Sequence, residues 1–333
     1  MKVDRNRLIE VFAELGHRLA EFGRDDASMR IVADAANDNA WFSPADIIMS
    51  ASNIRHQMLS EAALREWCSA YPIIRSPKNV GLIMAGNIPL VGFFDMLCIL
   101  ISGHKLYYKP SSKDSVLTEY IASQLKSIDD ELPVYKFDGE RIDAIIATGS
   151  DNTNRYFRSR YGTIPSIFRG SRSSVAVLDG SETDMELTAL ANDIFSYSGL
   201  GCRNVSHLIV PEGYDFGRLG KALDTWEIPN PKYINNFRQR SAMLDVERKS
   251  HVKGRHYILR EEPDFPAYIS EITWQMAESN DETMQWLAAN DNRTQCIVGK
   301  VGHPRCVPFG QSQSPGLTDY PDAVDVMEFL SGL

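Results

Sequence analysis

Buried-strand patterns alternate with helical patterns over the middle of the chain. Short apolar runs typical of strands cover residues 80–85, 105–108, 142–147 and 164–168. Segments with helical spacing lie between them, over residues 90–101, 114–125 and 152–161. Strands that are joined by helices lie parallel, because a right-handed crossover returns the chain to the same edge of the sheet. The alternation therefore predicts an α/β fold built on a parallel sheet.

The flanking regions predict further elements. Residues 1–70 have helical patterns, and Ser43-Pro44 is typical of an N-cap followed by a first-turn proline, which starts one helix toward Trp67. A second α/β unit begins near Ser174. Its expected strands and helices cover residues 175–178, 186–196, 208–210, 296–299 and 324–330. Residues 213–290 are expected to be mainly helical and irregular.

Three of the predicted strands end in turns that contain glycine or polar residues. These turns are Gly86-Asn87, Lys109-Pro110-Ser111 and Thr148-Gly149-Ser150. Ligands of parallel sheets bind beyond the carboxyl ends of the strands. The chain has neither a G-x-G-x-x-G fingerprint nor a G-x-x-x-x-G-K-[ST] loop. A nucleotide would therefore be held by Lys109 and helix N-termini, with a solvated lysine as the alternative.

One cysteine, Cys202, lies on a glycine-containing bend between a helical pattern and a strand pattern. Gly199 and Gly201 allow a substrate to approach the backbone closely. Such a bend leaves backbone N–H groups available to a thiolate or an oxyanion. Cys202 is thus a candidate nucleophile, and the alternative is a cysteine packed as a small apolar side chain.

The five cysteines are scattered and show no C-x-x-C spacing, so we expect neither disulfides nor a metal site, and a reducing compartment. The net charge of −9 argues against a nucleic-acid partner. No signal peptide is evident, and the longest apolar run, residues 88–102, contains Asp95 and is too short to span a bilayer. We therefore expect a cytoplasmic protein without a membrane span.

The three turns and the cysteine, in this order, resemble motifs of the aldehyde dehydrogenase superfamily. Gly86-Asn87-Ile88-Pro89 is similar to its W-N-F-P turn, which implies that Asn87 lines an oxyanion hole. The K-P-S turn implies contact with the cofactor ribose, and Thr148-Gly149-Ser150 is similar to the F-T-G-S turn at the cofactor phosphates. Gly199-Leu200-Gly201-Cys202 is similar to G-Q-x-C, which carries the nucleophile.

Within that superfamily the chain is most similar to acyl-CoA reductases of the bacterial luminescence (LuxC) type. The similarity rests on residues 86–92 followed by Asp95, and on residues 169–174; it covers residues 75–215 well, with Pro308-Phe309-Gly310 as a late anchor. It implies a Rossmann-type cofactor domain with a helical N-terminal segment (1–173) and an α/β catalytic domain carrying Cys202 (174–310). Residues 311–333 are expected to form a tail that packs back on the body.

Two departures from the superfamily pattern concern the reaction type and the choice of cofactor. Aldehyde-oxidising members carry a glutamate in an E-L-G-G turn that activates water, but the corresponding place here is Arg169-Gly170-Ser171. Without that base a hydrolytic step is disfavoured, and reduction of an activated acyl group is favoured. NAD-preferring members carry a glutamate after K-P-S, where this chain has Ser112-Lys113. A hydroxyl and an ammonium accept a 2′-phosphate, so we expect NADPH, with NADH as the alternative.

The resemblance thus implies NADPH-dependent reduction of an acyl-CoA or acyl-carrier-protein thioester to an aldehyde. Cys202 and Asn87 would be catalytic, and the expected cofactor-binding residues are Lys109, Ser111, Ser112, Gly149 and Ser150. Two alternatives stay open: an acyl phosphate reductase of the glutamyl phosphate reductase type, and a non-redox cysteine acyltransferase or acyl-binding protein. The base for Cys202 is not evident, since we expect a structural role for His207. Glu261 and Glu262 match the family's nicotinamide-ribose glutamate poorly, and a homo-oligomer is left open.

Overall fold

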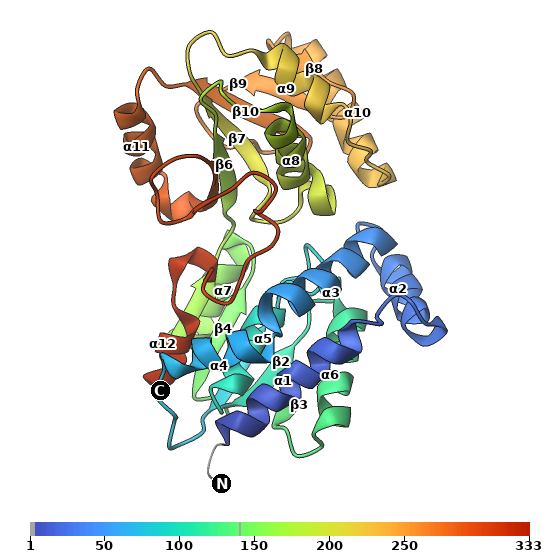
Figure 1. The fold of residues 1–333 in the computed structure, drawn as a ribbon, viewed down its shortest axis with the longest axis vertical. Coiled ribbons are helices and arrows are strands. Elements are labelled where there is room, and N and C mark those ends of the chain that lie inside the picture. Colours follow the sequence, from blue (N-terminus) through green and yellow to red (C-terminus); the bar gives the residue numbers. More distant parts are fainter. Residues whose placement is uncertain (1–3, 140) are drawn as a thin grey trace. The chain divides into compact units, whose positions relative to one another are not determined.

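The computed structural model describes residues 4–139 and 141–333, which form two compact units (Figure 1). Unit 1 consists of Met1–Ser171 and Gly316–Leu333, and unit 2 of Arg172–Pro315. The chain therefore leaves unit 1, completes unit 2 and returns. The sequence placed the corresponding boundaries at residues 173/174 and 310/311.

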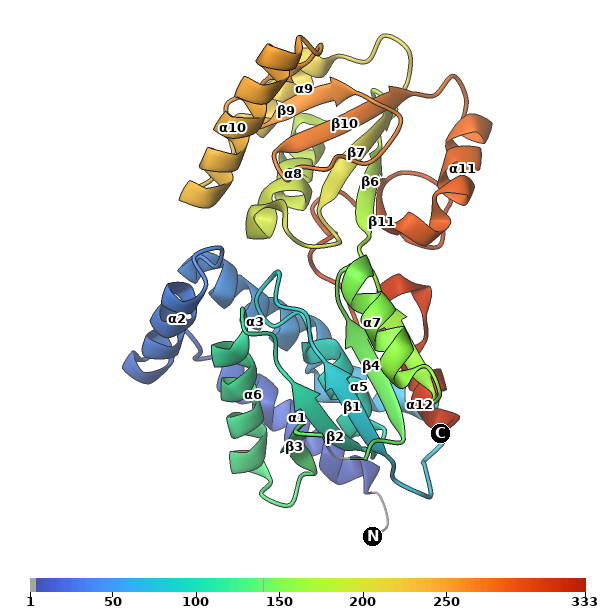
Figure 2. The same cartoon turned by 180° about the vertical axis from the view of Figure 1, so that it is seen from behind.

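Unit 1 contains a five-stranded parallel sheet in the order β3-β2-β1-β4-β5 (Figure 2). Its strands are β1 (Asn79–Ile83), β2 (Lys105–Lys109), β3 (Val134–Lys136), β4 (Ala144–Thr148) and β5 (Ser166–Arg169). The predicted α/β fold with a parallel sheet is confirmed. The short edge strand β3 was not predicted, since three residues give too little alternation to recognise.

Helices cover both faces of this sheet, with α7 on one face and α1, α5 and α6 on the other (Figures 1 and 2). The helices of unit 1 are α1 (Arg5–Leu19), α2 (Asp26–Asp38), α3 (Pro44–Met58), α4 (Glu61–Ser69), α5 (Phe93–Ile101), α6 (Ser115–Ile128), α7 (Asp151–Tyr161), η3 (Pro321–Ala323) and α12 (Val326–Ser331). The predicted single helix from Ser43-Pro44 to Trp67 is wrong, because the chain breaks at Leu59-Ser60. The break lets Leu59 pack against Gly16 of α1, where an added Cβ would approach the Leu59 Cβ to 2.9 Å.

The core of unit 1 contains a buried ion pair between Asp95 of α5 and Arg169 of β5. It also holds the returning C-terminal segment. Buried His104 accepts from the Lys78 N–H through Nδ1 at 3.0 Å, so its Nε2–H donates to the Leu330 carbonyl at 2.9 Å. These contacts attach α12 to the sheet through a side chain that must stay neutral.

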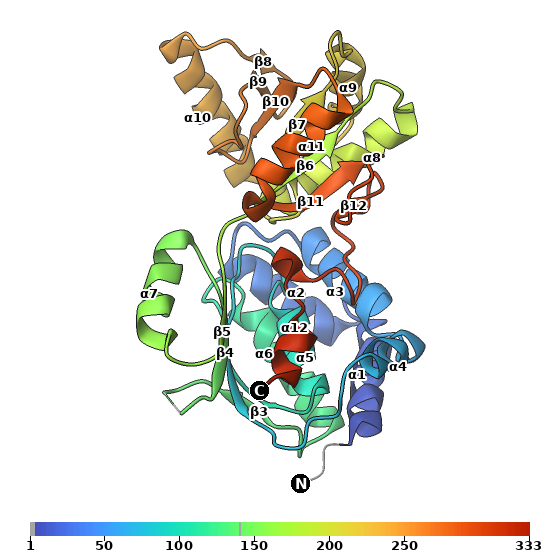
Figure 3. The same cartoon turned by 90° about the vertical axis from the view of Figure 1, so that its left-hand side faces the viewer.

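Unit 2 contains a seven-stranded sheet in the order β12-β11-β6-β7-β10-β9-β8, parallel except for β8 (Figure 3). Its strands are β6 (Ser173–Val177), β7 (Val205–Val210), β8 (Val252–Lys253), β9 (Ile258–Glu261), β10 (Glu271–Met276), β11 (Thr294–Gly299) and β12 (Cys306–Val307). Its helices are α8 (Asp184–Phe195), η1 (Ser196–Gly199), α9 (Phe216–Leu223), α10 (Pro231–Glu247), α11 (Asn280–Ala289) and η2 (Asp291–Arg293). The expectation of mainly helical structure over residues 213–290 missed β9 and β10, where polar residues interrupt the strand pattern.

The core of unit 2 encloses a histidine. His207 of β7 is fully buried and stacks on Trp286, with ring centroids 4.8 Å apart. The Thr273 hydroxyl donates to the Asp264 carbonyl at 2.7 Å, so the His207 Nδ1–H donates to that hydroxyl at 2.8 Å. The neutral ring is required, and burial lowers the pKa of His207 to about 4.

Unit 2 should lose stability in acid because of His207. The unfolded chain takes up a proton near its ordinary pKa of 6.5, whereas the folded chain resists protonation down to about 4. Stability contributed by the neutral ring is present above 6.5 and falls as the pH drops toward 4. Between pH 8 and pH 5 we expect the free energy of urea unfolding to fall by about 2 kcal/mol more in the wild type than in His207→Gln. Equal losses in the two proteins would contradict this assignment.

Candidate functional site

The strand register of unit 1 brings the three predicted turns to one edge of the sheet. Ile83, the last residue of β1, pairs with Lys109 of β2 and with Ala147 of β4. The three strands therefore end level with one another. The turns that follow them contain Asn87, Ser111 and Gly149, so these residues share the carboxyl edge, where parallel sheets bind their ligands.

The first two turns are in direct contact. A Cβ added at Gly86 would lie 2.6 Å from both the Cβ and the Oγ of Ser111, which excludes any side chain at this position. The Met84 N–H also donates to the Lys109 carbonyl, at 3.0 Å. The turn that carries Asn87 is thus packed against the turn that follows β2. Asn87 itself is exposed.

Two polar side chains, Asp114 and Ser50, hydrogen-bond to the backbone that follows Asn87. Leu90 adopts a left-handed conformation, with φ of 57°, which is unfavourable for a residue with a side chain. Its N–H donates to Asp114 Oδ2 at 2.8 Å, and the Ser50 hydroxyl donates to the Pro89 carbonyl at 2.7 Å. Burial raises the pKa of Asp114 to about 8. The sequence analysis missed Asp114, for which the only signal was an aspartate directly before a helix.

The predicted cofactor residues lie at or just beyond the carboxyl ends of β2 and β4. Lys109 and Ser112 are exposed at the end of β2, and the Ser111 hydroxyl accepts from the Lys113 N–H at 3.2 Å. Ser150 is the N-cap of α7 and accepts from a backbone N–H in the first turn of that helix. Gly149, directly before it, presents backbone without a side chain. A glycine followed by a helix N-terminus suits a phosphate group.

Cys202 lies in unit 2, on the connection between α8 and β7. Three consecutive residues before it, Tyr197, Ser198 and Gly199, have φ of 54°, 56° and 67°. This left-handed run turns the chain sharply after α8. Cys202 is half-buried, as is Cys306, whereas the other three cysteines, Cys68, Cys98 and Cys296, are buried. Cys202 is therefore partly accessible, and its role as a nucleophile stays a prediction.

Three further side chains were considered for a role in catalysis or cofactor binding. His207 is enclosed in the core of unit 2. Glu262 forms an ion pair with Arg260, whereas the Glu261 side chain is exposed at the end of β9. The pairing of Cys202 with Asn87 stays a prediction, because the two residues belong to different units.

In the sequence, Arg169 stands at the position where aldehyde-oxidising members of the superfamily carry a water-activating glutamate. It ends β5, is 4% exposed and forms the buried ion pair with Asp95. The carboxylate of that pair lies against a guanidinium and is itself buried. Neither residue presents a base to solvent at this place.

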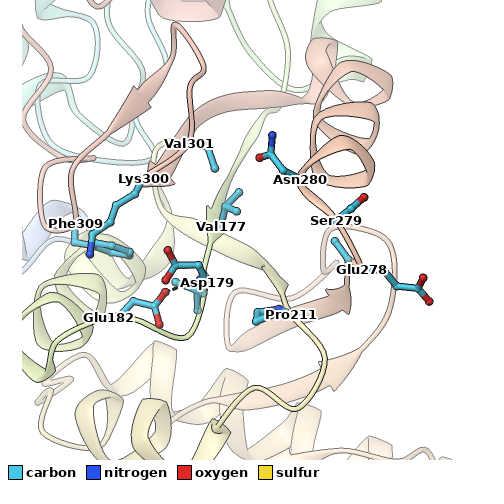
Figure 4. Close-up of a pocket in the computed structure, with 12 residues that line it drawn as sticks. Val177, Asp179, Glu182, Pro211, Glu278, Ser279, Asn280, Lys300, Val301 and Phe309 are labelled. Atoms are coloured by element: carbon cyan, nitrogen blue, oxygen red, sulfur yellow. Dashed lines mark hydrogen bonds between the residues drawn. The ribbon is translucent and has the colours of Figure 1, made fainter.

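Unit 2 contains a pocket of about 300 Å³ (Figure 4). It is formed beyond the carboxyl ends of β6, β7, β10 and β11, whereas Cys202 precedes the amino end of β7. Its charged lining residues are Asp179, Glu182, Glu278 and Lys300. None of the predicted site residues lines this pocket.

Two further properties concern residues 4–139 and 141–333. They contain no group of three or more histidine, cysteine, aspartate or glutamate side chains suited to a metal ion. None of the helices in this part of the chain has the length and apolar character that a membrane crossing requires.

Residues 51–215 match the family model described as acyl-CoA reductase (LuxC). The chain is also 23% identical, over 197 residues, to long-chain acyl-protein thioester reductase 2 of Photobacterium leiognathi. That alignment covers 52% of this chain and 41% of the relative, so the chain matches less than half of the relative's length.

Solved structures with the same fold are aldehyde dehydrogenases. A putative aldehyde dehydrogenase from Burkholderia cenocepacia is 14% identical with a TM-score of 0.66, covering 90% of this chain and 76% of that one. Aldehyde dehydrogenase 21 from Physcomitrella patens, in complex with the reaction product succinate, is 13% identical with a TM-score of 0.70, covering 99% and 84%. Glyceraldehyde-3-phosphate dehydrogenase GapN from Methanocaldococcus jannaschii, complexed with NADP, is 11% identical with a TM-score of 0.65, covering 93% and 82%. Residues 51–215 are thus similar to the acyl-CoA reductase (LuxC) family, and the chain shares the fold of the aldehyde dehydrogenases.

Proposed function

We propose that the protein reduces an acyl thioester, carried by CoA or by an acyl carrier protein, to an aldehyde with NADPH. The observation that carries this proposal is the half-buried Cys202 on a left-handed turn between α8 and β7. It lies inside the segment that matches the acyl-CoA reductase family. The relative named an acyl-protein thioester reductase supports a thioester as substrate.

In the proposed reaction the Cys202 thiolate attacks the carbonyl carbon of the thioester. The negative charge that develops on the carbonyl oxygen is stabilised by the Asn87 side-chain amide and the Cys202 backbone N–H. When the tetrahedral intermediate collapses, the carrier thiol leaves and the acyl group stays on Cys202 as a new thioester. A nicotinamide cofactor, when bound, would supply the hydride that reduces this thioester. Collapse of the resulting thiohemiacetal releases the aldehyde and restores Cys202.

The buried ion pair of Arg169 and Asp95 supports reduction of the acyl group over its hydrolysis. Arg169 and Asp95 are both buried and paired with each other. Since neither can take a proton from an incoming water, the acyl group on Cys202 is protected until hydride transfer.

The carboxyl edge of the unit 1 sheet supports a role in holding the cofactor. Lys109 and Ser111 would contact the adenosine ribose, and Ser112 the 2′ position. Gly149 and Ser150, at the N-terminus of α7, would receive the pyrophosphate, because backbone N–H groups there attract anions. NADP in the structure of GapN, which shares the fold, is consistent with such a cofactor. A cytoplasmic location remains an expectation from the sequence, and self-association stays open.

Cys202→Ala should abolish aldehyde formation and leave NADPH binding unchanged, because only the nucleophile is lost. The measurements are NADPH oxidation with long-chain acyl-CoA, and protein fluorescence quenching by NADPH. Cys306→Ala is the matched control, since Cys306 is the other half-buried cysteine, and it should keep full activity. Near-normal turnover of Cys202→Ala would contradict the mechanism. Absence of NADPH binding in the wild type would favour a non-redox acyltransferase, and turnover of acyl phosphates alone would favour an acyl phosphate reductase.

Asn87→Ala should lower kcat by about 10²–10³-fold, the usual effect of removing one oxyanion donor. KM for the acyl thioester should change little, because the ground-state carbonyl is less charged than the oxyanion. Steady-state kinetics separate the two parameters. An effect confined to KM would remove Asn87 from this role.

Ser112→Glu should shift the cofactor preference from NADPH toward NADH. A carboxylate at this exposed position repels a 2′-phosphate and accepts from a ribose diol. We expect the NADPH:NADH ratio of kcat/KM to fall by about tenfold, equivalent to about 1.4 kcal/mol. Ser112→Ala is the control, since it removes the hydroxyl without adding charge. A wild type that prefers NADH, or an unchanged ratio in Ser112→Glu, would show that this turn does not contact the 2′ position.

A further inference from the structure

A single buried amide, Asn204, ties together both ends of the turn that carries Cys202. Asn204 is 3% exposed. Its Oδ1 accepts from the Gly201 N–H at 2.8 Å, directly before Cys202. Its Nδ2 donates to the last carbonyls of α8 and of the residue after it, which are Asp193 (3.2 Å), Ile194 (3.1 Å) and Ser196 (2.9 Å). The side chain therefore satisfies carbonyls that a helix end leaves without partners.

The turn held by Asn204 is one that would not persist unaided. Tyr197 and Ser198 both carry side chains and both have positive φ, a conformation that is uncommon outside glycine and is retained where the surroundings impose it. Both are buried. The Asn204 side chain bonds to residues before this run and to Gly201 after it. It therefore fixes the backbone conformation that leads into Cys202.

Ser174 fixes the other side of the same turn. It lies on β6 and is fully buried. Its hydroxyl donates to the Cys202 carbonyl at 2.9 Å and accepts from the Cys296 N–H at 3.2 Å. Its N–H donates to the Asn204 carbonyl at 3.3 Å. The backbone of Cys202 is thus anchored to the neighbouring strand.

A third buried group extends this arrangement to the end of unit 2. The Asp193 carboxylate, fully buried at the end of α8, accepts from the Gly310 N–H at 2.6 Å and from the Ser312 N–H at 2.9 Å. Asn204 donates to the backbone carbonyl of the same Asp193. The segment around Gly310, noted in the sequence as a late family anchor, therefore braces the helix end from which the nucleophile turn departs.

We propose that Asn204 and Ser174 are positioning residues that set the orientation of Cys202 for attack on the acyl carbonyl. This inference rests on the proposed function, in which Cys202 is the nucleophile. The Asn204 side chain bonds to backbone before Cys202, the Ser174 hydroxyl bonds to the Cys202 carbonyl, and neither side chain has to contact the substrate. A misplaced nucleophile lowers the rate of the chemical step far more than it weakens substrate binding.

The test compares Asn204→Asp and Ser174→Ala with the wild type. Asn204→Asp keeps the shape of the side chain but loses its N–H donors, and Ser174→Ala removes one hydroxyl. Asn290→Asp is the matched control, because the Asn290 amide likewise donates to a helix-end carbonyl, that of Trp286 at 3.0 Å. Asn290 lies at the end of α11, on the other face of the sheet from α8 (Figures 1 and 3).

We expect kcat for acyl-CoA reduction to fall by about 10²-fold in Asn204→Asp and about tenfold in Ser174→Ala, with KM for both substrates within about twofold of the wild type. An activity-independent measurement accompanies it: the rate of alkylation by iodoacetamide, quantified by peptide mass spectrometry. Cys202 should react at least about fivefold more slowly in both variants, since the backbone that carries it is no longer held in one conformation. Cys306 in the same samples is the internal reference and should be unchanged.

Variants whose kcat and Cys202 alkylation both match Asn290→Asp would overturn the proposal, even if their melting temperatures fell. If Asn204→Asp does not fold, Ser174→Ala decides the question by the same two measurements. A wild type that forms no aldehyde from any acyl thioester would refute the proposed function alone. In that case the alkylation rates still show whether Asn204 and Ser174 control the reactivity of Cys202.

Discussion

Parallel pairing around β1 determines where the chemistry of unit 1 lies. Because Ile83 pairs with both Lys109 and Ala147, three turns that are far apart in the sequence end at one edge. Because Gly86 has no side chain, the Asn87 turn can pack directly against Ser111. A shift of one residue in either register would separate the turns and turn every strand side chain to the opposite face.

Unit 2 is also a mainly parallel sheet, but its candidate nucleophile lies at the other edge. Cys202 precedes β7, and the pocket of unit 2 lies beyond the carboxyl ends of the strands. The rule that ligands bind at carboxyl ends points to the three turns in unit 1 and, in unit 2, to this pocket and not to Cys202. The Cys202 segment itself follows the sharp left-handed turn after α8 and is held by hydrogen bonds of Asn204 and Ser174.

The sequence predicted the features that depend on neighbouring residues. The apolar runs identified β1, β2 and β4, and the turn residues identified Asn87, Lys109 and Gly149 as candidates. Features that depend on distant contacts were missed.

The break at Leu59, for example, lies where Leu59 packs against Gly16 of α1. Asp114 gains its role by accepting from the Leu90 N–H, and Asn204 by reaching back to α8. β9 and β10 carry buried Arg260 and Glu271, whose ion pair a hydropathy pattern counts as polar surface. Each of these residues became informative only once the three-dimensional partner was known.

The return of the chain to unit 1 sets the order in which the protein can be completed during synthesis. Leu330 and its neighbours in α12 belong to the same buried cluster as the α5 residues, and His104 bonds to the Leu330 carbonyl. Unit 2 is one continuous stretch, Arg172–Pro315, whereas unit 1 needs Gly316–Leu333 to close its core. On the ribosome unit 1 therefore stays incomplete until the residues that follow unit 2 have been made, and until then it exposes apolar surface on which chaperones act.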